Sequence, residues 1–453
     1  MKTKKLLFLA IPALAMASLT GCGQSYDVKL VIYNWADYIY DGTDDDGNAT
    51  QKSTVKLFEE YYQEKYGKTI KVQYRTFSTP EIMYGQITSN RIKPDLICPS
   101  DYMIQKMANE GLLEKFSYTE NKTANAEGKY EVGQYGDSLK NFADYGSPFI
   151  KDKFANTRLN DGNSFLTYAV PYFWGTMGFT YDPEYFSEEE IGTWEALWSK
   201  DSRFQKQLSL KDSMRDSYVT AIFHVYKDEI AALDENDPAY NAKLTAIFNR
   251  HDDRTIKAVE DALSEACKTT VNALEVDEGK SEIVKGTYHA NLAWSGDAIF
   301  AMDSAEEGET PKFLNYALPK EGSNVWFDGW CMPKGAQVDV AEEFVNFVSS
   351  PEIAVLNMDF VGYTSPIVGD EMWDYVTETY EAGEEVTDTY EVDLSFYFGK
   401  EAKINIDSEE KGRQFDAQYP TEEVLKKCCI MEDFGEDTSK VQDMWLRVKG
   451  SIK

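Results

Sequence analysis

Histidine is scarce in this chain of 453 residues, which contains only His224, His251 and His289. None of the three has metal-ligand spacing to another histidine or to a cysteine pair, which argues against a zinc site and against histidine-based catalysis. Basic residues are also few, because 46 Lys and Arg stand against 78 Asp and Glu, giving a formal net charge of −32. Nucleic-acid-binding proteins present basic surfaces, so this balance argues against a nucleic-acid partner.

Long hydrophobic runs are absent beyond the N-terminus, but aromatic residues are plentiful. They make up 14% of the chain, with 29 Tyr, 24 Phe and 9 Trp. So many rings can bury a large core, which excludes an intrinsically disordered chain. The length predicts two or three domains. The excess of acidic residues serves either solubility or the attraction of a cation.

The N-terminus is typical of an export signal. Three lysines within residues 1–5 precede an apolar run over residues 6–19, which is too short for a relaxed membrane span. The run ends in LTGC (19–22), as a bacterial lipoprotein signal does. We expect residues 1–21 to be removed and lipidated Cys22 to hold the protein at the outer face of the cytoplasmic membrane, at the cell surface or in the periplasm. The alternative is an ordinary secretory signal followed by a chance cysteine.

Five other cysteines remain, and this odd number excludes a fully paired intrachain set. They are Cys98, Cys267, Cys331, Cys428 and Cys429. The adjacent pair lacks the CxxC spacing of a metal or redox motif. We expect buried or unpaired thiols, and one disulfide is the alternative in an exported protein.

The first part of the body alternates predicted strands and helices. Residues 28–34, 70–74 and 95–99 are apolar runs that predict strands. Apolar residues at helical spacing over 55–66 predict a helix between the first two strands. Thr79 followed by Pro80 predicts the start of another helix between the second and third strands. This β-α-β-α-β order favours a parallel sheet covered by helices.

Later segments predict a second lobe. Residues 170–182 form a long extended segment suited to crossing between lobes, and residues 287–299 and 325–333 are two more extended segments that end in polar loops. Helices are predicted over 340–348 and from Pro351 toward Gly362. We therefore expect two α/β lobes, with the chain crossing between them more than once.

Three predicted loops place a tryptophan two or three positions before an aspartate. They are Trp35-Ala36-Asp37-Tyr38, Trp294-Ser295-Gly296-Asp297 and Trp326-Phe327-Asp328. Residues i and i+2 of an extended chain point to the same side, and each loop follows a strand, where open α/β sheets bind ligands. A ring beside a carboxylate suits an alkyl ammonium, through cation–π attraction of ~0.5–2 kcal/mol and charge-assisted hydrogen bonds of roughly 1.5–3 kcal/mol. The alternative is that each tryptophan is core and each aspartate a turn or cap residue.

A longer set of motifs occurs in a fixed order along the chain. It comprises YNWADYI (33–39), DLICPSDYM (95–103), VPYFWGTMGFTYDP (170–183), SLKDSMRDSYVTA (209–221), LAWSGDA (292–298), WFDGWCMPKGA (326–336) and FVGYTSPI (360–367). The set resembles the spermidine/putrescine-binding proteins, the extracellular receptors of bacterial polyamine ABC importers. The resemblance implies an α/β, two-lobed periplasmic-binding-protein type II fold, in which each lobe is a mainly parallel sheet flanked by helices and the ligand lies in the interlobe cleft.

The resemblance also implies approximate lobes and a ligand site. Residues 22–175 plus 328–375 would form lobe 1, and residues 176–327 plus 376–453 would form lobe 2. The implied polyamine-binding residues are Trp35, Asp37, Tyr38, Ser100, Tyr102, Asp216, Trp294, Asp297, Trp326, Asp328 and Tyr363. The four aspartates would pair with ligand ammonium groups. Alternatively, Ser100 is a helix cap, Tyr102 and Tyr363 are core aromatics, and Asp216 pairs with Arg215.

Three departures from the family pattern bear on the ligand. Ser213 stands where spermidine binders carry a further acid, and Asp297 stands where they are neutral and putrescine binders are acidic. Both departures favour putrescine. Ala36 replaces the usual hydroxyl residue. The chain is also longer than typical members, with extra residues near 40–53, 117–150, 225–265 and 376–440.

The resulting hypothesis is a monomeric capture-and-deliver receptor. It would bind putrescine, spermidine or both outside the membrane, without metal or cofactor, and deliver them to ABC permease subunits. An alternative is the same fold for ferric iron or an aminophosphonate, although the Trp-Asp pattern fits neither well. A surface hydrolase or an adhesin is a more remote alternative. The chain has no GxSxG motif, and Gly67-Lys68-Thr69 does not complete a P-loop, so we predict no enzyme.

Overall fold

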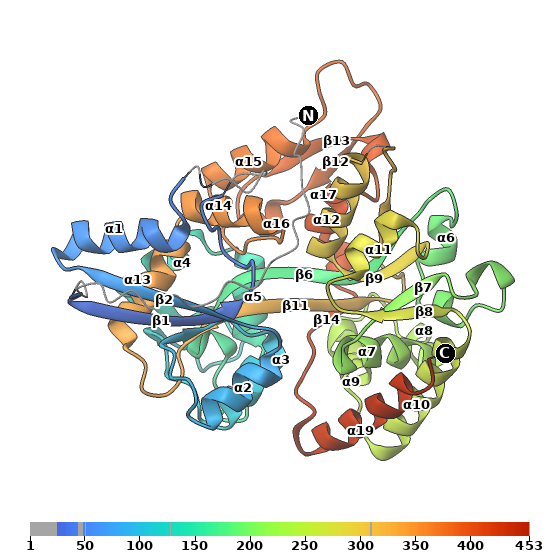
Figure 1. The fold of residues 1–453 in the computed structure, drawn as a ribbon, viewed down its shortest axis with the longest axis horizontal. Coiled ribbons are helices and arrows are strands. Elements are labelled where there is room, and N and C mark those ends of the chain that lie inside the picture. Colours follow the sequence, from blue (N-terminus) through green and yellow to red (C-terminus); the bar gives the residue numbers. More distant parts are fainter. Residues whose placement is uncertain (1–24, 44–48, 50, 127, 309, 453) are drawn as a thin grey trace, which may run out of the picture.

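A single mixed sheet runs through the whole molecule (Figure 1). The computed structural model describes residues 25–452 except 44–48, 50, 127 and 309; the predicted signal (1–21) and Cys22 therefore lie outside the described residues. Ten strands follow the order β2-β1-β3-β11-β6-β9-β7-β8, with β10 paired to β6 and β14 paired to β11. Their bounds are β1 Val28–Trp35, β2 Ile70–Phe77, β3 Leu96–Ile97, β6 Ala169–Tyr181, β7 Leu208–Lys211, β8 Val271–Glu275, β9 Ala290–Trp294, β10 Asn315–Ala317, β11 Ser323–Cys331 and β14 Cys428–Cys429.

Helices cover both faces of this sheet, and two short hairpins lie outside it. The helices are α1 Thr54–Tyr66, α2 Pro80–Thr88, α3 Asp101–Asn109, α4 Lys140–Tyr145, α5 Pro148–Asn156, α6 Glu188–Ile191, α7 Met214–Val225, α8 Lys227–Ala231, α9 Tyr240–Phe248, α10 Asp253–Lys268, α11 Gly279–Lys285, α12 Ser295–Glu306, α13 Val338–Val348, α14 Pro351–Val361, α15 Asp370–Tyr380, α16 Ser395–Phe398, α17 Gln414–Gln418, α18 Glu422–Leu425 and α19 Thr438–Lys449. The hairpins pair β4 (Tyr118–Thr119) with β5 (Gln134–Tyr135) and β12 (Thr389–Asp393) with β13 (Lys403–Asp407).

The N-terminal β-α-β-α-β unit forms as its sequence predicts. Strand β1 pairs in parallel with both β2 and β3. Helix α1 ends at Gly67, whose φ of 64° is a left-handed conformation that favours glycine. Helix α2 begins at Pro80 after Thr79, whose side chain accepts a hydrogen bond from the Ile82 amide. Because β1 and β3 are parallel neighbours, their carboxyl ends lie together on the same side of the sheet.

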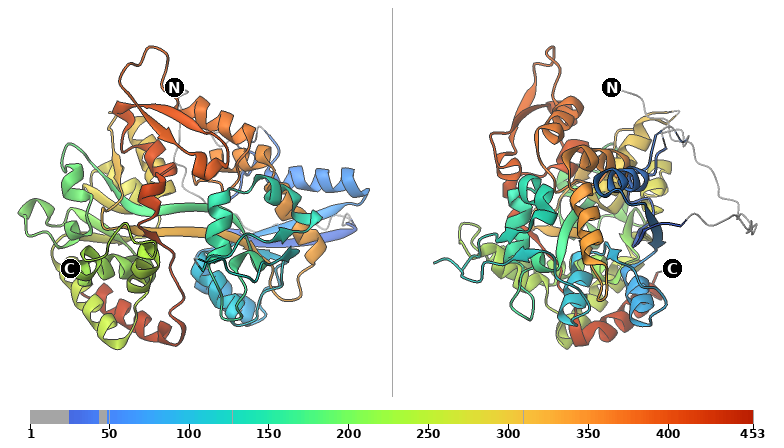
Figure 2. Two further views of the ribbon diagram at one scale, coloured as in Figure 1. Left: turned by 180° about the vertical axis from the view of Figure 1, so that it is seen from behind. Right: turned by 90° about the vertical axis from the view of Figure 1, so that its left-hand side faces the viewer.

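Strands β6 and β11 cross the molecule side by side as an antiparallel pair, as Figure 2 shows from behind. Every residue of both strands is buried, which explains why both read as continuous apolar runs rather than alternating ones. Beyond them, β6 pairs with β9 and β11 pairs with β3. The predicted crossing segments are therefore central strands, and they join the two halves of the sheet.

Two of the predicted Trp-Asp loops are regular structure instead. Strand β9 ends at Trp294 and α12 begins at Ser295, so Asp297 lies in the first turn of a helix. Apolar residues continue beyond Asp297 at helical spacing, and Ala298, Ala301 and Met302 are fully buried. Trp326 and Asp328 lie within β11, where a polar side chain needs hydrogen-bonding partners from neighbouring elements.

The core consists of two large hydrophobic clusters and a small one. The first gathers β1, β2, β3, β11 and the first half of β6, and the second gathers the other half of β6 with β7 and α7, α9, α10 and α19. The third lies mainly under α12. The expected two-lobed α/β class is thus confirmed. The lobe boundaries remain a prediction, and buried side chains between Val376 and Cys428 belong mostly to the first cluster.

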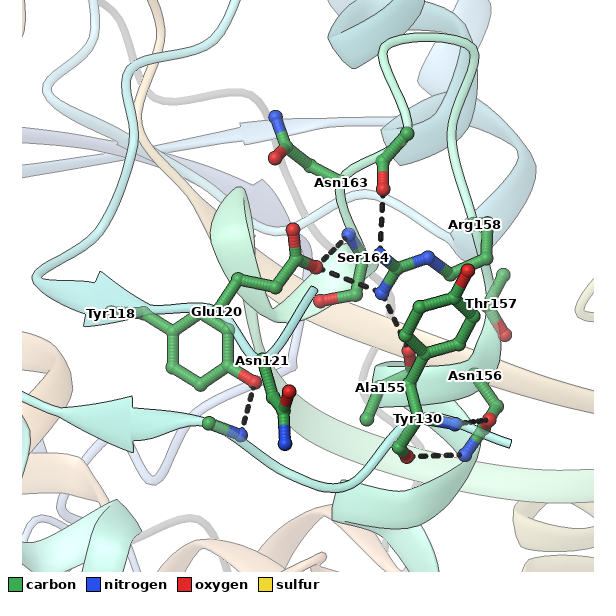
Figure 3. Close-up of polar contacts among 12 residues, drawn as sticks. Tyr118, Glu120, Asn121, Tyr130, Ala155, Asn156, Thr157, Arg158, Asn163 and Ser164 are labelled. Atoms are coloured by element: carbon green, nitrogen blue, oxygen red, sulfur yellow. Dashed lines mark hydrogen bonds and ion pairs between the residues drawn. The ribbon is translucent and has the colours of Figure 1, made fainter. Parts of the chain in front are cut away.

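A partly buried ion pair helps to hold the insertion near 117–150, whose Leu139, Phe142 and Ile150 also belong to the first hydrophobic cluster. Glu120 accepts hydrogen bonds from Arg158 at 2.9 Å and from the Ser164 amide at 2.5 Å (Figure 3). The guanidinium of Arg158 also lies 3.9 Å from the ring centre of Tyr130. This arrangement ties the insertion to the segment that leads into β6.

Two further expectations concern the pairing of the cysteines and the presence of membrane-spanning helices. Cys98, Cys267, Cys331, Cys428 and Cys429 are all buried and free, which confirms the prediction of unpaired thiols. Within the described ranges, no helix combines the length and apolar character that crossing a bilayer requires.

Candidate ligand-binding site

Four of the predicted aromatic residues form a continuous series of rings. The ring centres of Trp35 and Tyr38 lie 6.5 Å apart, those of Tyr38 and Tyr363 5.7 Å, and those of Tyr363 and Trp326 5.1 Å. Tyr363 enters the series because α14 ends at Gly362, with a φ of 81°. Most of these pairs are edge-on, the arrangement that ring quadrupoles favour. Three segments distant in sequence thus build one aromatic wall.

Asp328 lies beside this wall, with only 5% of its surface exposed. The hydroxyl of Tyr38 donates a 2.5 Å hydrogen bond to its Oδ2 atom. Its Oδ1 atom is buried and has no hydrogen-bonding partner among the described residues. Burial raises the pKa of Asp328 to about 6, although the hydrogen bond from Tyr38 and the nearby Ser100 hydroxyl oppose that shift. A buried carboxylate with a free oxygen is poised to accept a hydrogen bond from a ligand.

Ser100 stands between β3 and α3 and forms an isolated bridge with Asp328. The next residue, Asp101, was not predicted from the sequence. Its carboxylate accepts hydrogen bonds from the amides of Phe327 at 3.1 Å and Tyr102 at 2.7 Å, and burial raises its pKa to about 8. Asp101 therefore fixes β11 to the start of α3. The sequence offered one sign of this role, because an acidic residue at the first position of a helix is favoured there by the helix dipole.

Tyr102 and Asp216 bring α3 of the first cluster close to α7 of the second. The guanidinium of Arg215 lies 4.3 Å from the ring centre of Tyr102. Asp216 accepts a 3.3 Å hydrogen bond from Trp294 Nε1, and burial raises its pKa. Arg215 forms its ion pair with Asp433, at 3.6 Å. Asp216 therefore faces Trp294 rather than its sequence neighbour.

Asp297 differs from the other carboxylates because the chain itself neutralises it. Lys211 Nζ donates to Oδ2 at 2.9 Å, while Oδ1 accepts from Lys280 Nζ at 3.4 Å and from the Tyr363 hydroxyl at 3.1 Å. Burial alone would raise the pKa of Asp297, but the two lysines together hold it below its ordinary value. Lys211 Nζ also lies 3.8 Å from the centre of the Trp294 ring.

Neither lysine was predicted as part of the site. Lys211 is the last residue of β7, only 1% of its surface is exposed, and it also donates to the carbonyl of Val276. Lys280 comes from α11. A lysine at the end of a buried strand was a usable signal, because such ammonium groups require a partner.

Asp37 is the exception among the four predicted carboxylates. It is exposed in the turn after β1, with a φ of 51°. Trp35, two residues earlier, is partly buried, and within the described part of the chain its indole Nε1 has no hydrogen-bonding partner. The charge of Asp37 nonetheless adds to the raised pKa of Lys280, after the larger effects of Asp297 and Asp277.

The predicted residues therefore gather in two neighbouring groups that Tyr363 joins. One group surrounds Asp328 and contains the aromatic wall; the other contains Asp216, Trp294 and Asp297. In the part of the chain that the structure describes, no Lys, Arg or His forms an ion pair with Asp328 or Asp216. Two buried carboxylates thus lack a cation.

The sequence matches a family of known proteins over most of its length. The model of the bacterial extracellular solute-binding proteins matches residues 56–369. The spermidine/putrescine-binding periplasmic protein of Salmonella typhimurium is 24% identical over 360 residues, covering 79% of this chain and 83% of its own. The putrescine-binding periplasmic protein SpuD of Pseudomonas aeruginosa is 24% identical, covering 96% of each chain.

Solved structures show the same fold. A spermidine/putrescine ABC transporter substrate-binding protein, PotD of Streptococcus pneumoniae, aligns over 94% of this chain and 99% of its own, with a TM-score of 0.58 and 24% identity. A lipoprotein of Treponema pallidum aligns over 93% and 99% of the two chains, with a TM-score of 0.60 and 18% identity. These similarities extend across both hydrophobic clusters.

Proposed function

Since the chain belongs to the family of bacterial extracellular solute-binding proteins, we propose that it captures polyamines outside the membrane and delivers them to an ABC permease. The observation that carries this proposal is Asp328, a buried carboxylate beside Tyr38 and Trp326 whose Oδ1 has no partner in the described ranges. An alkyl ammonium satisfies such a group, because it supplies both a charge and N–H donors. Several relatives are named for binding spermidine or putrescine.

The aromatic residues complement this carboxylate. Methylene groups of an alkyl chain pack on the faces of Trp35 and Trp326, while the adjoining ammonium gains cation–π attraction of about 0.5–2 kcal/mol. Burial strengthens the charge-assisted hydrogen bond to Asp328, because little water competes for it. Among the residues that the structure describes, the Nε1 atom of Trp35 has no acceptor, so it can donate a hydrogen bond to a hydrated or substituted ligand.

Ligand binding would favour closure of the two lobes. Tyr38 belongs to the first cluster and donates to Asp328 on β11, whereas Asp216 lies on α7, whose apolar residues belong to the second cluster. A diammonium ligand that pairs with Asp328 and Asp216 makes both contacts only when the lobes are together. Its binding energy therefore shifts the population toward the closed form that a permease recognises.

The place of action follows from the N-terminal sequence and the family. We propose that the protein acts as a monomer outside the cytoplasmic membrane, held there by a lipid on Cys22. It needs no catalytic group, metal or cofactor for capture and release. In the described ranges, no three His, Cys, Asp or Glu side chains cluster in a way that could hold a metal ion.

Isothermal calorimetry with the lipid-free mature chain tests the proposal. Putrescine, cadaverine, spermidine and spermine are titrated separately, with ferric iron and an aminophosphonate as competing ligand classes. We expect a dissociation constant below ~100 μM for at least one polyamine. Binding of iron or the aminophosphonate alone, or of none of these compounds, would overturn the proposed ligand class.

A further inference from the structure

The site already contains one ammonium group of its own. Lys211 Nζ lies between the Trp294 ring, at 3.8 Å from its centre, and Asp297 Oδ2, at 2.9 Å. This is the environment, an aromatic face with a buried carboxylate, that a ligand ammonium would occupy. Lys211 also donates to the Val276 carbonyl, so its position is fixed by three separate contacts. The lysine thus fills a cation position from inside the protein.

The other two buried carboxylates are not ion-paired with a lysine in this way. Asp216 and Asp328 are 8% and 5% exposed, and burial raises the pKa of each. Asp297 is similarly buried, yet its pKa is lowered. The difference arises because Lys211 and Lys280 form ion pairs with Asp297. No cation of the described residues is within ion-pair distance of Asp216 or Asp328; the charges of Lys211 and Arg215 act on Asp216 only from farther away, and burial outweighs their effect on its pKa. Two cation positions are therefore open and one is closed.

We infer that Lys211 excludes a third ligand ammonium from the Trp294–Asp297 position, so that the site prefers diamines to polyamines with three or more ammonium groups. This inference rests on the proposed polyamine-binding function. A diamine matches the open positions, with one ammonium at Asp328 and the other at Asp216. A triamine must place its extra charge near Lys211 or leave it in the site without a carboxylate partner, and both arrangements are unfavourable.

Lys280 supports the same selectivity from the more exposed side. Its side chain is 28% exposed, and its Nζ atom lies 3.4 Å from Asp297 Oδ1. Burial opposes the charged form of Lys280, but Asp297 and Asp277 outweigh this effect and raise its pKa. Lys280 thus stays protonated and adds a second positive charge beside the closed position. Because it is less buried than Lys211, its replacement disturbs the fold less.

The decisive experiment measures the ratio of affinities for spermidine and putrescine. Calorimetry on the wild-type protein should show tighter binding of putrescine or cadaverine than of spermidine. In Lys211→Met, Asp297 loses its main partner and becomes available, so we expect the spermidine-to-putrescine affinity ratio to rise at least tenfold, or about 1.4 kcal/mol. A purely structural role for Lys211 would weaken both ligands together and leave the ratio unchanged.

Two further variants make the result specific. In the double variant Lys211→Met/Asp297→Asn, the carboxylate is also removed, so the ratio should return toward the wild-type value. In Lys280→Met, the ratio should rise in the same direction but less. If Lys211→Met does not fold, Lys280→Met and the wild-type preference decide the question.

The outcomes separate this inference from the function on which it rests. Absence of binding to every polyamine contradicts the proposed function and, with it, the inference. Polyamine binding with tighter affinity for spermidine in the wild type, or an unchanged ratio in the folded lysine variants, leaves the function standing and overturns only the role of Lys211.

Discussion

The guanidinium of Arg215, on α7, lies 4.3 Å from the ring centre of Tyr102, on α3. This contact joins the two hydrophobic clusters directly. Arg215 also lies 4.1 Å from the ring centre of Phe434 and pairs with Asp433, and the Asp433 amide donates to Gln105 of α3. The loop before α19 therefore reinforces the connection between α3 and α7.

Replacement of Arg215 should weaken closure. Lysine keeps the charge but lacks the planar group that stacks on Tyr102, and the lost attraction is up to about 2 kcal/mol. We expect Arg215→Lys to enlarge the radius of gyration of the ligand-free protein in X-ray scattering and to raise its dissociation constant for putrescine. Arg203→Lys, at an exposed ion pair, is the matched control. Identical scattering from both variants would argue against this role.

Asp328 should be the most sensitive position for binding. Asparagine keeps an oxygen to accept from Tyr38 but removes the negative charge beside the ligand ammonium. Loss of one partner of a buried charge pair costs about 2–5 kcal/mol, so Asp328→Asn should weaken putrescine binding by at least ~30-fold. Asp339→Asn, at an exposed position of α13, is the control in the same calorimetric assay. Equal affinities for the two variants would place the ligand elsewhere.

Ligand affinity should fall as the pH drops through about 6. The pKa of Asp328 is raised to about 6 by burial, so below this pH the carboxyl is protonated and an ammonium must displace that proton. For this group alone, the stability of the ligand-free protein increases as the pH falls from about 6 toward the ordinary value near 3.9. Calorimetry in buffers of different ionisation enthalpy should reveal proton release at pH 6, and Asp328→Asn should abolish that component.

Gly296 should be intolerant of a side chain. A Cβ atom there would lie 1.3 Å from Tyr363 Cδ1, so Gly296→Ala must displace Tyr363 and break its hydrogen bond to Asp297. We expect a lower melting temperature and weaker putrescine binding. In Gly85→Ala, where nothing lies within 4 Å, the helix should gain roughly 0.5–1 kcal/mol. Similar melting temperatures for the two variants would show that Tyr363 moves freely.

Anchoring should depend on Cys22. We expect Cys22→Ser to remove the lipid and release the protein from the membrane fraction into the aqueous phase of a detergent partition. Cys98→Ser, at one of the buried free thiols, keeps the proposed lipid and serves as the control. Retention of Cys22→Ser in the detergent phase would assign the anchor to another segment.

Local sequence signals predicted most of the N-terminal architecture. The helix stop at Gly67 and the start at Thr79-Pro80 formed as expected, because such signals act within a few residues. The Trp-Asp patterns also marked residues that the fold brings together. Their local structure was predicted incorrectly at Asp297 and Asp328, because strand pairing and helix packing with distant segments decide it.

The sequence by itself determined which side chains are available: many aromatic rings, and more acidic residues than basic ones. Only the tertiary structure decided how those charges are paired. Tyr38 and Asp328 are 290 residues apart, and Lys211 and Asp297 are 86 apart, separations at which spacing along the chain carries no information about contact. The physical reason is burial: a carboxylate deprived of water needs a partner. The fold supplies two ion-paired lysines to Asp297, whereas no residue that the structure describes forms an ion pair with Asp216 or Asp328.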